Sequence, residues 1–244
     1  MGEDPAPVDG MIPLKDLNPS RTRPGVTILL IAANAFLFLY ELSLGPNIQP
    51  FIMQAAFVPA RYLGDAGGLG GGSLSAGFAS ALLSMFLHGG WMHFLGNMLF
   101  LWIFGDNVED HLGHLRFLFF YLASGFAATA AQAFMDPGST VPMIGASGAI
   151  SGVLGAYLFL YPRARIVSLV FLGIFVQIMQ VPAIVFLPIW FLIQFFSGLA
   201  SLGAPTAHSG GVAFFAHIGG FVAGSVLLFV LGGRKPPPPA ALPW

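Results

Sequence analysis

The chain has 244 residues, of which 56% are hydrophobic and only 8% are charged, with a net charge of −1. A soluble domain carries about 25% charged residues, so this composition excludes a soluble globular protein and indicates a membrane protein with several spans. The near-neutral charge argues against nucleic acid as a partner, and the absence of cysteine excludes disulfides, cysteine nucleophiles and thiolate metal sites.

The apolar runs of the sequence predict a membrane domain between two polar tails. Residues 1–25 are polar and rich in proline, and we expect them to form a mobile cytosolic tail. Residues 233–244 contain a run of prolines and are expected to form a second cytosolic tail. Between the tails, apolar runs bounded by polar, glycine or proline residues predict six membrane-spanning helices. Their ranges are 26–44, 91–108, 116–135, 144–161, 183–202 and 212–232.

The positive charges predict how these helices are oriented. If the N-terminus is cytosolic, all of the 9 lysines and arginines except Arg61 fall on the cytosolic side. This asymmetry predicts that both chain ends are cytosolic and that the long 45–90 connection is external. The apolar stretch 166–181 lacks a polar turn, and a seventh span would move Arg234 and Lys235 to the outside. We therefore expect 166–181 to be an interfacial or obliquely inserted segment that leads into the fifth helix.

Polar and ionisable side chains lie in the first turns of the second, fourth and sixth predicted helices, which all run inward from the external side. They are His93 and Asn97, then Ser147, then His217. Because such groups are costly within a membrane, three helices that bring them to one depth predict a functional site there.

Ser147 has two interpretations. Gly148, Gly152 and Gly155 follow it on one face of small residues, which favours a role in close helix packing. The alternative is a nucleophile, which needs a base within hydrogen-bonding reach because a serine hydroxyl is weakly nucleophilic at neutral pH.

His217 is the candidate base. Gly220 and Gly224 follow it at spacings of three and seven, so the three residues share one face of the sixth helix. Parallel docking of this face on the glycine face of the fourth helix would bring His217 to Ser147. A histidine that only donates a packing hydrogen bond is the alternative interpretation.

His93 and Asn97 are four residues apart and therefore point the same way from the second helix. They are interpreted either as a hydrogen-bonded pair between helices or as donors that stabilise charge on a carbonyl oxygen. None of the 10 acidic residues has a fixed relation to His217, so the sequence predicts a serine–histidine dyad rather than a triad.

Three separated sequence motifs of this chain resemble those of one protein family. "HGGWMHFLGN" (88–97), "GASG" (145–148) and "AHIGGFVAG" (216–224) are similar to motifs of the rhomboid intramembrane serine proteases. The resemblance covers about 26–232 and implies an all-α bundle of six transmembrane helices, with both ends cytosolic and a large first external loop. It also implies a serine endopeptidase that cleaves transmembrane segments of other membrane proteins near their outer ends. No metal, nucleotide or other cofactor is implied, and we expect a bacterial inner membrane.

The resemblance also assigns roles to residues. Ser147 resembles the family's nucleophile and His217 its general base. His93, Asn97 and the Ser147 backbone N–H resemble oxyanion donors, while the motif and packing positions are His88, Gly145, Gly148, Gly220 and Gly224. The sequence departs from many bacterial relatives at Ser151, where they have a tyrosine that stacks on the base. What orients His217 is therefore left open by the sequence.

Two other functions compete with this hypothesis. One is a catalytically inactive rhomboid-like protein that binds membrane partners, but such relatives lose the serine or the histidine, and this chain has both. The other is a transporter, for which we would expect ionisable residues near the middle of the bilayer or a repeated half. The sequence contains neither feature.

Overall fold

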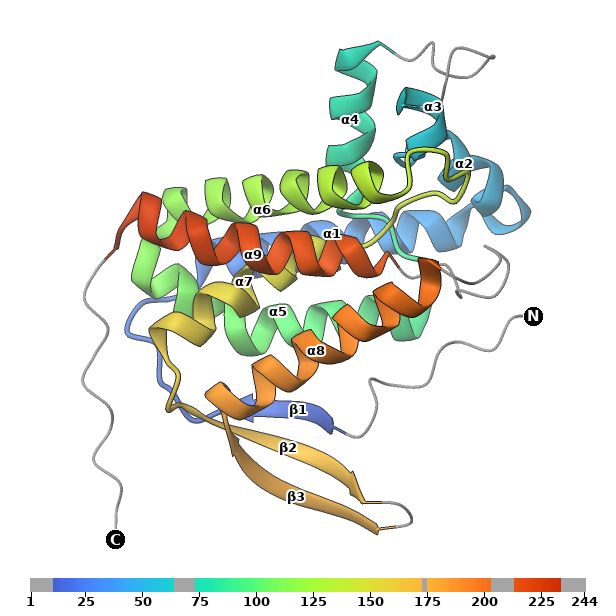
Figure 1. The fold of residues 1–244 in the computed structure, drawn as a ribbon. Helices are drawn as coiled ribbons and strands as arrows, with labels where there is room; N and C mark the ends of the chain where they lie inside the picture. Colours follow the sequence, from blue (N-terminus) through green and yellow to red (C-terminus); the bar gives the residue numbers. More distant parts are fainter. Residues whose placement is uncertain (1–10, 64–72, 173–174, 203–212, 234–244) are drawn as a thin grey trace, which may run out of the picture.

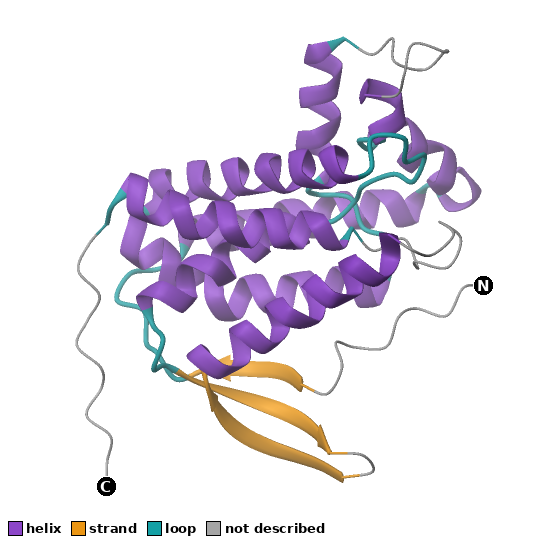
Figure 2. Ribbon diagram, in the orientation of Figure 1, coloured by secondary structure: helices purple, strands orange, loops and turns teal. Residues whose placement is uncertain are grey.

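The computed structural model describes residues 11–63, 73–172, 175–202 and 213–233. The described part is mostly helical, with one small sheet along the side of a helix bundle (Figure 1; Figure 2). The bundle helices are α1 (Gly25–Ser43), α5 (Trp91–Leu112), α6 (His114–Met135), α7 (Ser147–Leu160), α8 (Ala183–Leu202) and α9 (Phe214–Leu231). They correspond to the six predicted helices, with ends that differ by a few residues.

The connection between α1 and α5 is itself partly helical. Its elements are the short 3-10 helix η2 (Gly45–Asn47), α2 (Ile48–Ala55), α3 (Pro59–Leu63) and α4 (Leu74–Ser84). These elements gather at the end of the bundle where α1 finishes (Figure 1). Residues 64–72 of this connection lie outside the described residues.

Within the described residues, α1, α6 and α9 are long and apolar enough to cross a membrane by length and composition. Helices α7 and α8 are apolar over shorter lengths. With 14 residues, α7 measures about 21 Å at ~1.5 Å per residue, which is less than the ~30 Å of a hydrocarbon core. It is also the central helix, because every residue from Gly148 to Tyr157 is buried.

Close contacts between α6 and the glycines of α7 explain why α7 can lie at the centre. A β-carbon added at Gly148 would lie 2.6 Å from the β-carbon of Ala128 on α6. One added at Gly152 would lie 2.5 Å from the Ser124 side chain of the same helix. Neither position has room for a side chain, so glycine is what lets α6 approach α7 this closely.

The expectation of an all-α fold is wrong for two segments. Strands β1 (Met11–Asp16), β2 (Arg165–Leu172) and β3 (Phe175–Pro182) form an antiparallel sheet in the order β1-β2-β3. The segment expected to be interfacial or obliquely inserted is thus a β-hairpin, which extends away from α8 (Figure 1). Ile166, Ser168 and Val170 alternate as its buried face on β2, whereas β3 is exposed along most of its length.

The expectation of a mobile N-terminal tail is wrong for the part of it that the structure describes. Besides β1, Asp16 anchors this part, because it accepts hydrogen bonds from the Tyr157 hydroxyl at 2.6 Å and from the Asn107 amide at 3.1 Å. Burial, with a contribution from Asp106, raises the pKa of Asp16 to about 7. Residues 1–10 and 234–244, the rest of the expected tails, lie outside the described residues.

The last turns of α5 hold the start of α1. Glu109 accepts hydrogen bonds from the backbone N–H groups of Val26 and Thr27 at 2.8 and 2.7 Å, and its carboxylate also contacts His114. A carboxylate at the start of a helix satisfies N–H groups that have no partner within the helix. Glu109 therefore joins the end of α5 to the start of α1.

Candidate active site

Ser147 and His217 are in contact. Ser147 is the first residue of α7, and His217 lies in the first turn of α9. The Nε2 atom of His217 lies 2.8 Å from Oγ of Ser147, although the residues are 70 positions apart. This distance allows the serine hydroxyl to donate a hydrogen bond to the imidazole.

The glycine faces of α7 and α9 bring this pair together. A β-carbon at Gly220 would overlap the carbonyl oxygen of Gly148, and one at Gly224 would overlap that of Gly152. The two contacts lie one turn apart on both helices, so the helices run parallel with their backbones touching. The parallel docking expected from the sequence is found, and it sets the first turns of both helices side by side.

A residue that sequence reasoning missed faces the other ring nitrogen of His217. The Oε1 atom of Gln194 on α8 lies 2.6 Å from Nδ1 of His217, and the Gln194 side chain is buried. One turn earlier on α8, the ring of Trp190 lies 6.0 Å from the ring of His217, centroid to centroid. A signal was available, since Gln194 is the only amide side chain in a helix that is apolar apart from two serines.

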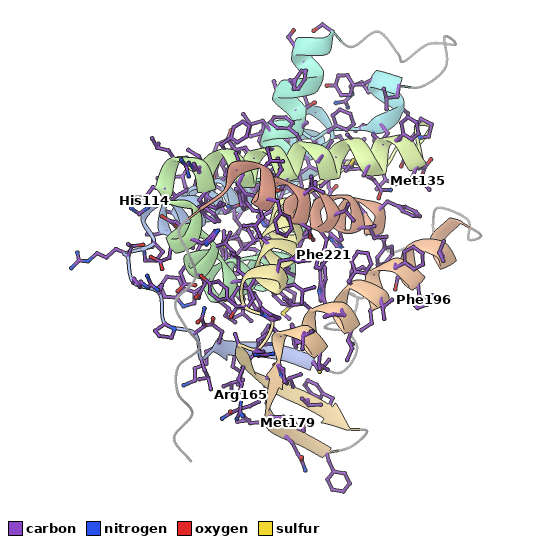
Figure 3. The ribbon with its side chains drawn as sticks, turned by 60° about the vertical axis from the view of Figure 1, so that its left-hand side comes forward. His114, Met135, Arg165, Met179, Phe196 and Phe221 are labelled. Carbon is purple, nitrogen blue, oxygen red and sulfur yellow. The ribbon has the colours of Figure 1, made fainter. Side chains whose placement is uncertain are left out.

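The aromatic contact between α8 and α9 continues below the histidine. The ring of Phe221 on α9 lies 4.9 Å from that of Phe191 and 6.4 Å from that of Trp190. Figure 3 shows Phe221 inside the bundle, whereas Phe196, further along α8, points away from it. These rings set the position of α8 against His217.

His93 and Asn97 lie against the turn that precedes Ser147. Gly145 in this turn has φ +116°, and a β-carbon there would lie 2.5 Å from Nε2 of His93 and 3.6 Å from Nδ2 of Asn97. The backbone N–H of Gly89 donates to Nδ1 of His93 at 3.4 Å. Because Nδ1 accepts, the proton of a neutral His93 ring belongs on Nε2, the nitrogen that faces the turn.

The amide nitrogen Nδ2 of Asn97 is buried and makes no hydrogen bond within the described structure. A buried amide donor without an acceptor is costly unless a further group satisfies it. An oxygen atom placed beside Gly145 would meet donors from both Asn97 and His93. The arrangement is therefore suited to hold an oxyanion.

His88 lies beside this donor pair rather than in contact with Ser147. Its ring is 5.2 Å from the ring of His93, centroid to centroid, and its backbone N–H donates to the Glu41 carboxylate at 3.2 Å. Burial, and secondarily the nearby His93, lowers the pKa of His88 to about 3. The side chain is thus neutral at physiological pH, and it packs against the ring of His93.

A cavity of about 30 Å³ adjoins Ser147. Its walls come from α4, α6, α7, the start of α9 and the turn before Ser147, and include Ser84, Thr129 and Gly145. This volume is sufficient for a water molecule with polar neighbours. Across the described residues, no group of three or more histidine, aspartate or glutamate side chains is placed to hold a metal ion.

Known proteins resemble this chain over the region that carries the site. Residues 75–234, more than half of the chain, match the family model of the rhomboid domain. The chain is 36% identical over 145 residues to RHOMBOID-like protein 4 of Arabidopsis thaliana, covering 59% of this chain and 32% of that protein. It is 44% identical over 78 residues to the Rhomboid protease GluP of Bacillus subtilis, covering 32% and 15%. Rhomboid protein 1, mitochondrial, of Saccharomyces cerevisiae is 35% identical over 96 residues, covering 38% and 28%. The matched part spans about a third or less of each relative.

Proposed function

This chain belongs to the rhomboid family, and on that premise we propose that it is an intramembrane serine endopeptidase. Ser147 is the proposed nucleophile and His217 the proposed general base. The observation that carries the proposal is the 2.8 Å contact between His217 Nε2 and Ser147 Oγ. A positioned base is what a serine hydroxyl needs to attack a carbonyl carbon at neutral pH.

The proposed reaction proceeds in two steps. His217 takes the hydroxyl proton as Ser147 Oγ bonds to the scissile carbonyl carbon, and it then gives that proton to the leaving amine. The result is an acyl-enzyme ester on Ser147. A water molecule, activated by the same histidine, then attacks the ester and restores the serine; the cavity beside Ser147 could admit this water.

Charge on the carbonyl oxygen is stabilised by three donors in this proposal. They are the Asn97 amide, His93 Nε2 and the backbone N–H of Ser147. Because Ser147 is the first residue of α7, its N–H is one of those without a partner inside the helix, at the positive end of the helix dipole. Donors fixed in place before the reaction are the usual source of the largest electrostatic gain in acyl transfer.

The proposed substrates are transmembrane segments of other proteins, cleaved near their outer ends. The chain is an integral membrane protein, and the short central helix α7 begins with Ser147. Since α7 is about 9 Å shorter than a hydrocarbon core, a helix aligned with its neighbours at the inner end would start below the outer surface. With the N-terminus in the cytosol, the site faces the external half. A bacterial inner membrane is part of this proposal, although relatives also include plant and mitochondrial proteins.

An inactive family member that only binds membrane partners is the alternative. The hydrogen-bonded pair of Ser147 and His217 favours the protease, because a binding protein has no need of a base on its serine. The Bacillus relative named as a protease supports the same choice at the level of the family.

Cleavage of a reporter tests the proposal. Purified protein in lipid vesicles is incubated with single-pass reporter proteins that differ in their transmembrane sequence, and the products are sized by mass spectrometry. We expect cleavage within or near the outer end of a reporter span by the wild type, and none by Ser147→Ala. Cleavage that continues in Ser147→Ala would remove the proposed function.

A further inference from the structure

Gln194 contacts the ring nitrogen of His217 that does not face Ser147. The Oε1–Nδ1 distance is 2.6 Å, and both groups lie inside the bundle between α8 and α9. Together with the Ser147 contact, this gives the imidazole one polar partner at each nitrogen. The role inferred for Gln194 rests on the proposed function, because Gln194 contacts the base of that reaction.

The chemistry of an amide oxygen decides which ring nitrogen carries the proton. Oε1 can only accept a hydrogen bond, so the contact at 2.6 Å requires a proton on Nδ1. A neutral imidazole then has its lone pair on Nε2, the nitrogen that faces the serine hydroxyl. In the other tautomer, two lone pairs would meet at Nδ1 and a ring N–H would point at Ser147 Oγ. We propose that Gln194 is a positioning residue that holds His217 in the tautomer that acts as a base.

The need for such a residue follows from Ser151. Its hydroxyl donates to the carbonyl oxygen of Ser147 at 2.7 Å, so it satisfies its own helix and not the histidine. The contacts that orient the ring come instead from α8. Trp190 and Gln194 are four residues apart and thus share one face of that helix.

The contact is expected to strengthen during the reaction. When His217 takes the serine proton it becomes an imidazolium, and its Nδ1–H bond to Gln194 becomes charge-assisted. An interaction that is stronger in the transition state than in the ground state raises kcat without changing substrate affinity. Gln194 should therefore affect kcat and leave KM nearly unchanged.

The test combines nitrogen-15 spectra of the His217 ring with kinetics. Protein labelled in its histidines is measured at a pH where the imidazole is neutral, and the His217 signals are identified by their loss in His217→Ala. In the wild type we expect the proton on Nδ1. Gln194→Met keeps the length of the side chain but removes the acceptor, and Gln194→Leu repeats this with a different shape. In both, we expect a substantial population with the proton on Nε2, and a fall in kcat of about 10- to 100-fold.

Two further variants separate orientation from general packing. Gln194→Glu keeps the acceptor and should restore the Nδ1 proton and most of kcat. Gln132→Met is the matched control, because Gln132 accepts from the backbone N–H groups of Phe215 and Ala216 and so supports the start of α9 without touching the ring. It should lower the unfolding temperature while the proton of His217 stays on Nδ1.

The spectra decide the positioning role independently of proteolysis. A wild-type ring with its proton on Nε2, or a Gln194→Met ring that keeps it on Nδ1 with wild-type kcat, would overturn the proposal. If the tautomer shifts as expected but the wild type cleaves no reporter, Gln194 retains its positioning role and the proposed protease function fails instead.

Discussion

The α-carbon of Gly220 on α9 lies against the carbonyl oxygen of Gly148 on α7, so closely that a β-carbon at 220 would overlap this oxygen. Gly220→Ala must therefore push α9 away and lengthen the contact between His217 and Ser147. We expect a lower unfolding temperature and, because a displacement of about 1 Å can cost ~10²-fold in rate, a comparable loss of kcat.

Gly96→Ala on α5 is the matched control for this substitution. A β-carbon there meets open space, and alanine favours a helix by about 1 kcal/mol over glycine. Thermal unfolding in detergent and reporter cleavage should both remain at the wild-type level or above. Equal stability and activity of Gly220→Ala and Gly96→Ala would show that the glycine contact does not align the pair.

The proposed base and the proposed oxyanion donors should respond differently to truncation. Removing one oxyanion donor typically costs ~10²–10³ in kcat, or about 2.7–4 kcal/mol. Asn97→Ala should therefore be slow but measurable, since other donors remain, whereas His217→Ala should leave no measurable cleavage. His93→Ala is expected to fall between them. Reporter cleavage together with thermal unfolding checks this order, and a His217→Ala variant more active than Asn97→Ala would refute the assigned roles.

Position 145 requires glycine for two reasons, the backbone conformation there and the lack of room for a side chain. Its φ of +116° is unfavourable for any side chain, and a β-carbon would lie 2.5 Å from His93 Nε2. We expect Gly145→Ala to displace His93 and to lower kcat by at least ~10²-fold, as loss of an oxyanion donor does. Gly138→Ala, where a β-carbon meets open space, is the control for a loop glycine. Wild-type kcat in Gly145→Ala would contradict the close approach of His93 to this turn.

Asp16 should make stability depend on pH. Its pKa is raised to about 7 in the folded chain, mainly by burial, compared with about 3.9 in an unfolded one. The stabilisation from its bound proton is complete below the unfolded value and is lost as pH rises through 7. We expect the unfolding temperature of the wild type to fall by a few degrees between about pH 5 and pH 8.

Asp16→Asn tests whether Asp16 causes this pH dependence. The variant keeps the contact with α7, since an asparagine oxygen can still accept a hydrogen bond from the Tyr157 hydroxyl. The variant should have a smaller pH dependence of its unfolding temperature than the wild type. An unchanged pH dependence in Asp16→Asn would assign the effect to another group.

The helices and the central pair were predictable because their signals are local. Each helix is an apolar run with its own boundaries, and the glycines that follow Ser147 and His217 mark the faces that dock. The sheet was not predictable in this way. Val176, Ile178 and Met179 make β3 apolar on both faces, so the alternation typical of a strand is absent, and hydropathy alone suggests a membrane segment.

Long-range pairing explains the remaining differences. Met11 pairs with Val170, and this contact joins parts of the chain that no local pattern connects. Gln194 was missed for a different reason: α8 has a single glycine and therefore lacks the repeated glycines that mark the docking faces of α7 and α9. The amide side chain of Gln194 in a mostly apolar helix was the available signal, but its partner His217 is apparent only once α8 and α9 are packed together.

The most direct measurement of the central claim is covalent labelling of Ser147, since it needs no knowledge of the substrate. Purified wild type, Ser147→Ala and His217→Ala are treated with a fluorophosphonate probe, and the adduct is mapped by peptide mass spectrometry. An activated serine predicts one adduct, on Ser147, in the wild type, and none at that position in either variant. A wild type that is not labelled at Ser147, or an adduct that forms equally fast in His217→Ala, would contradict the account.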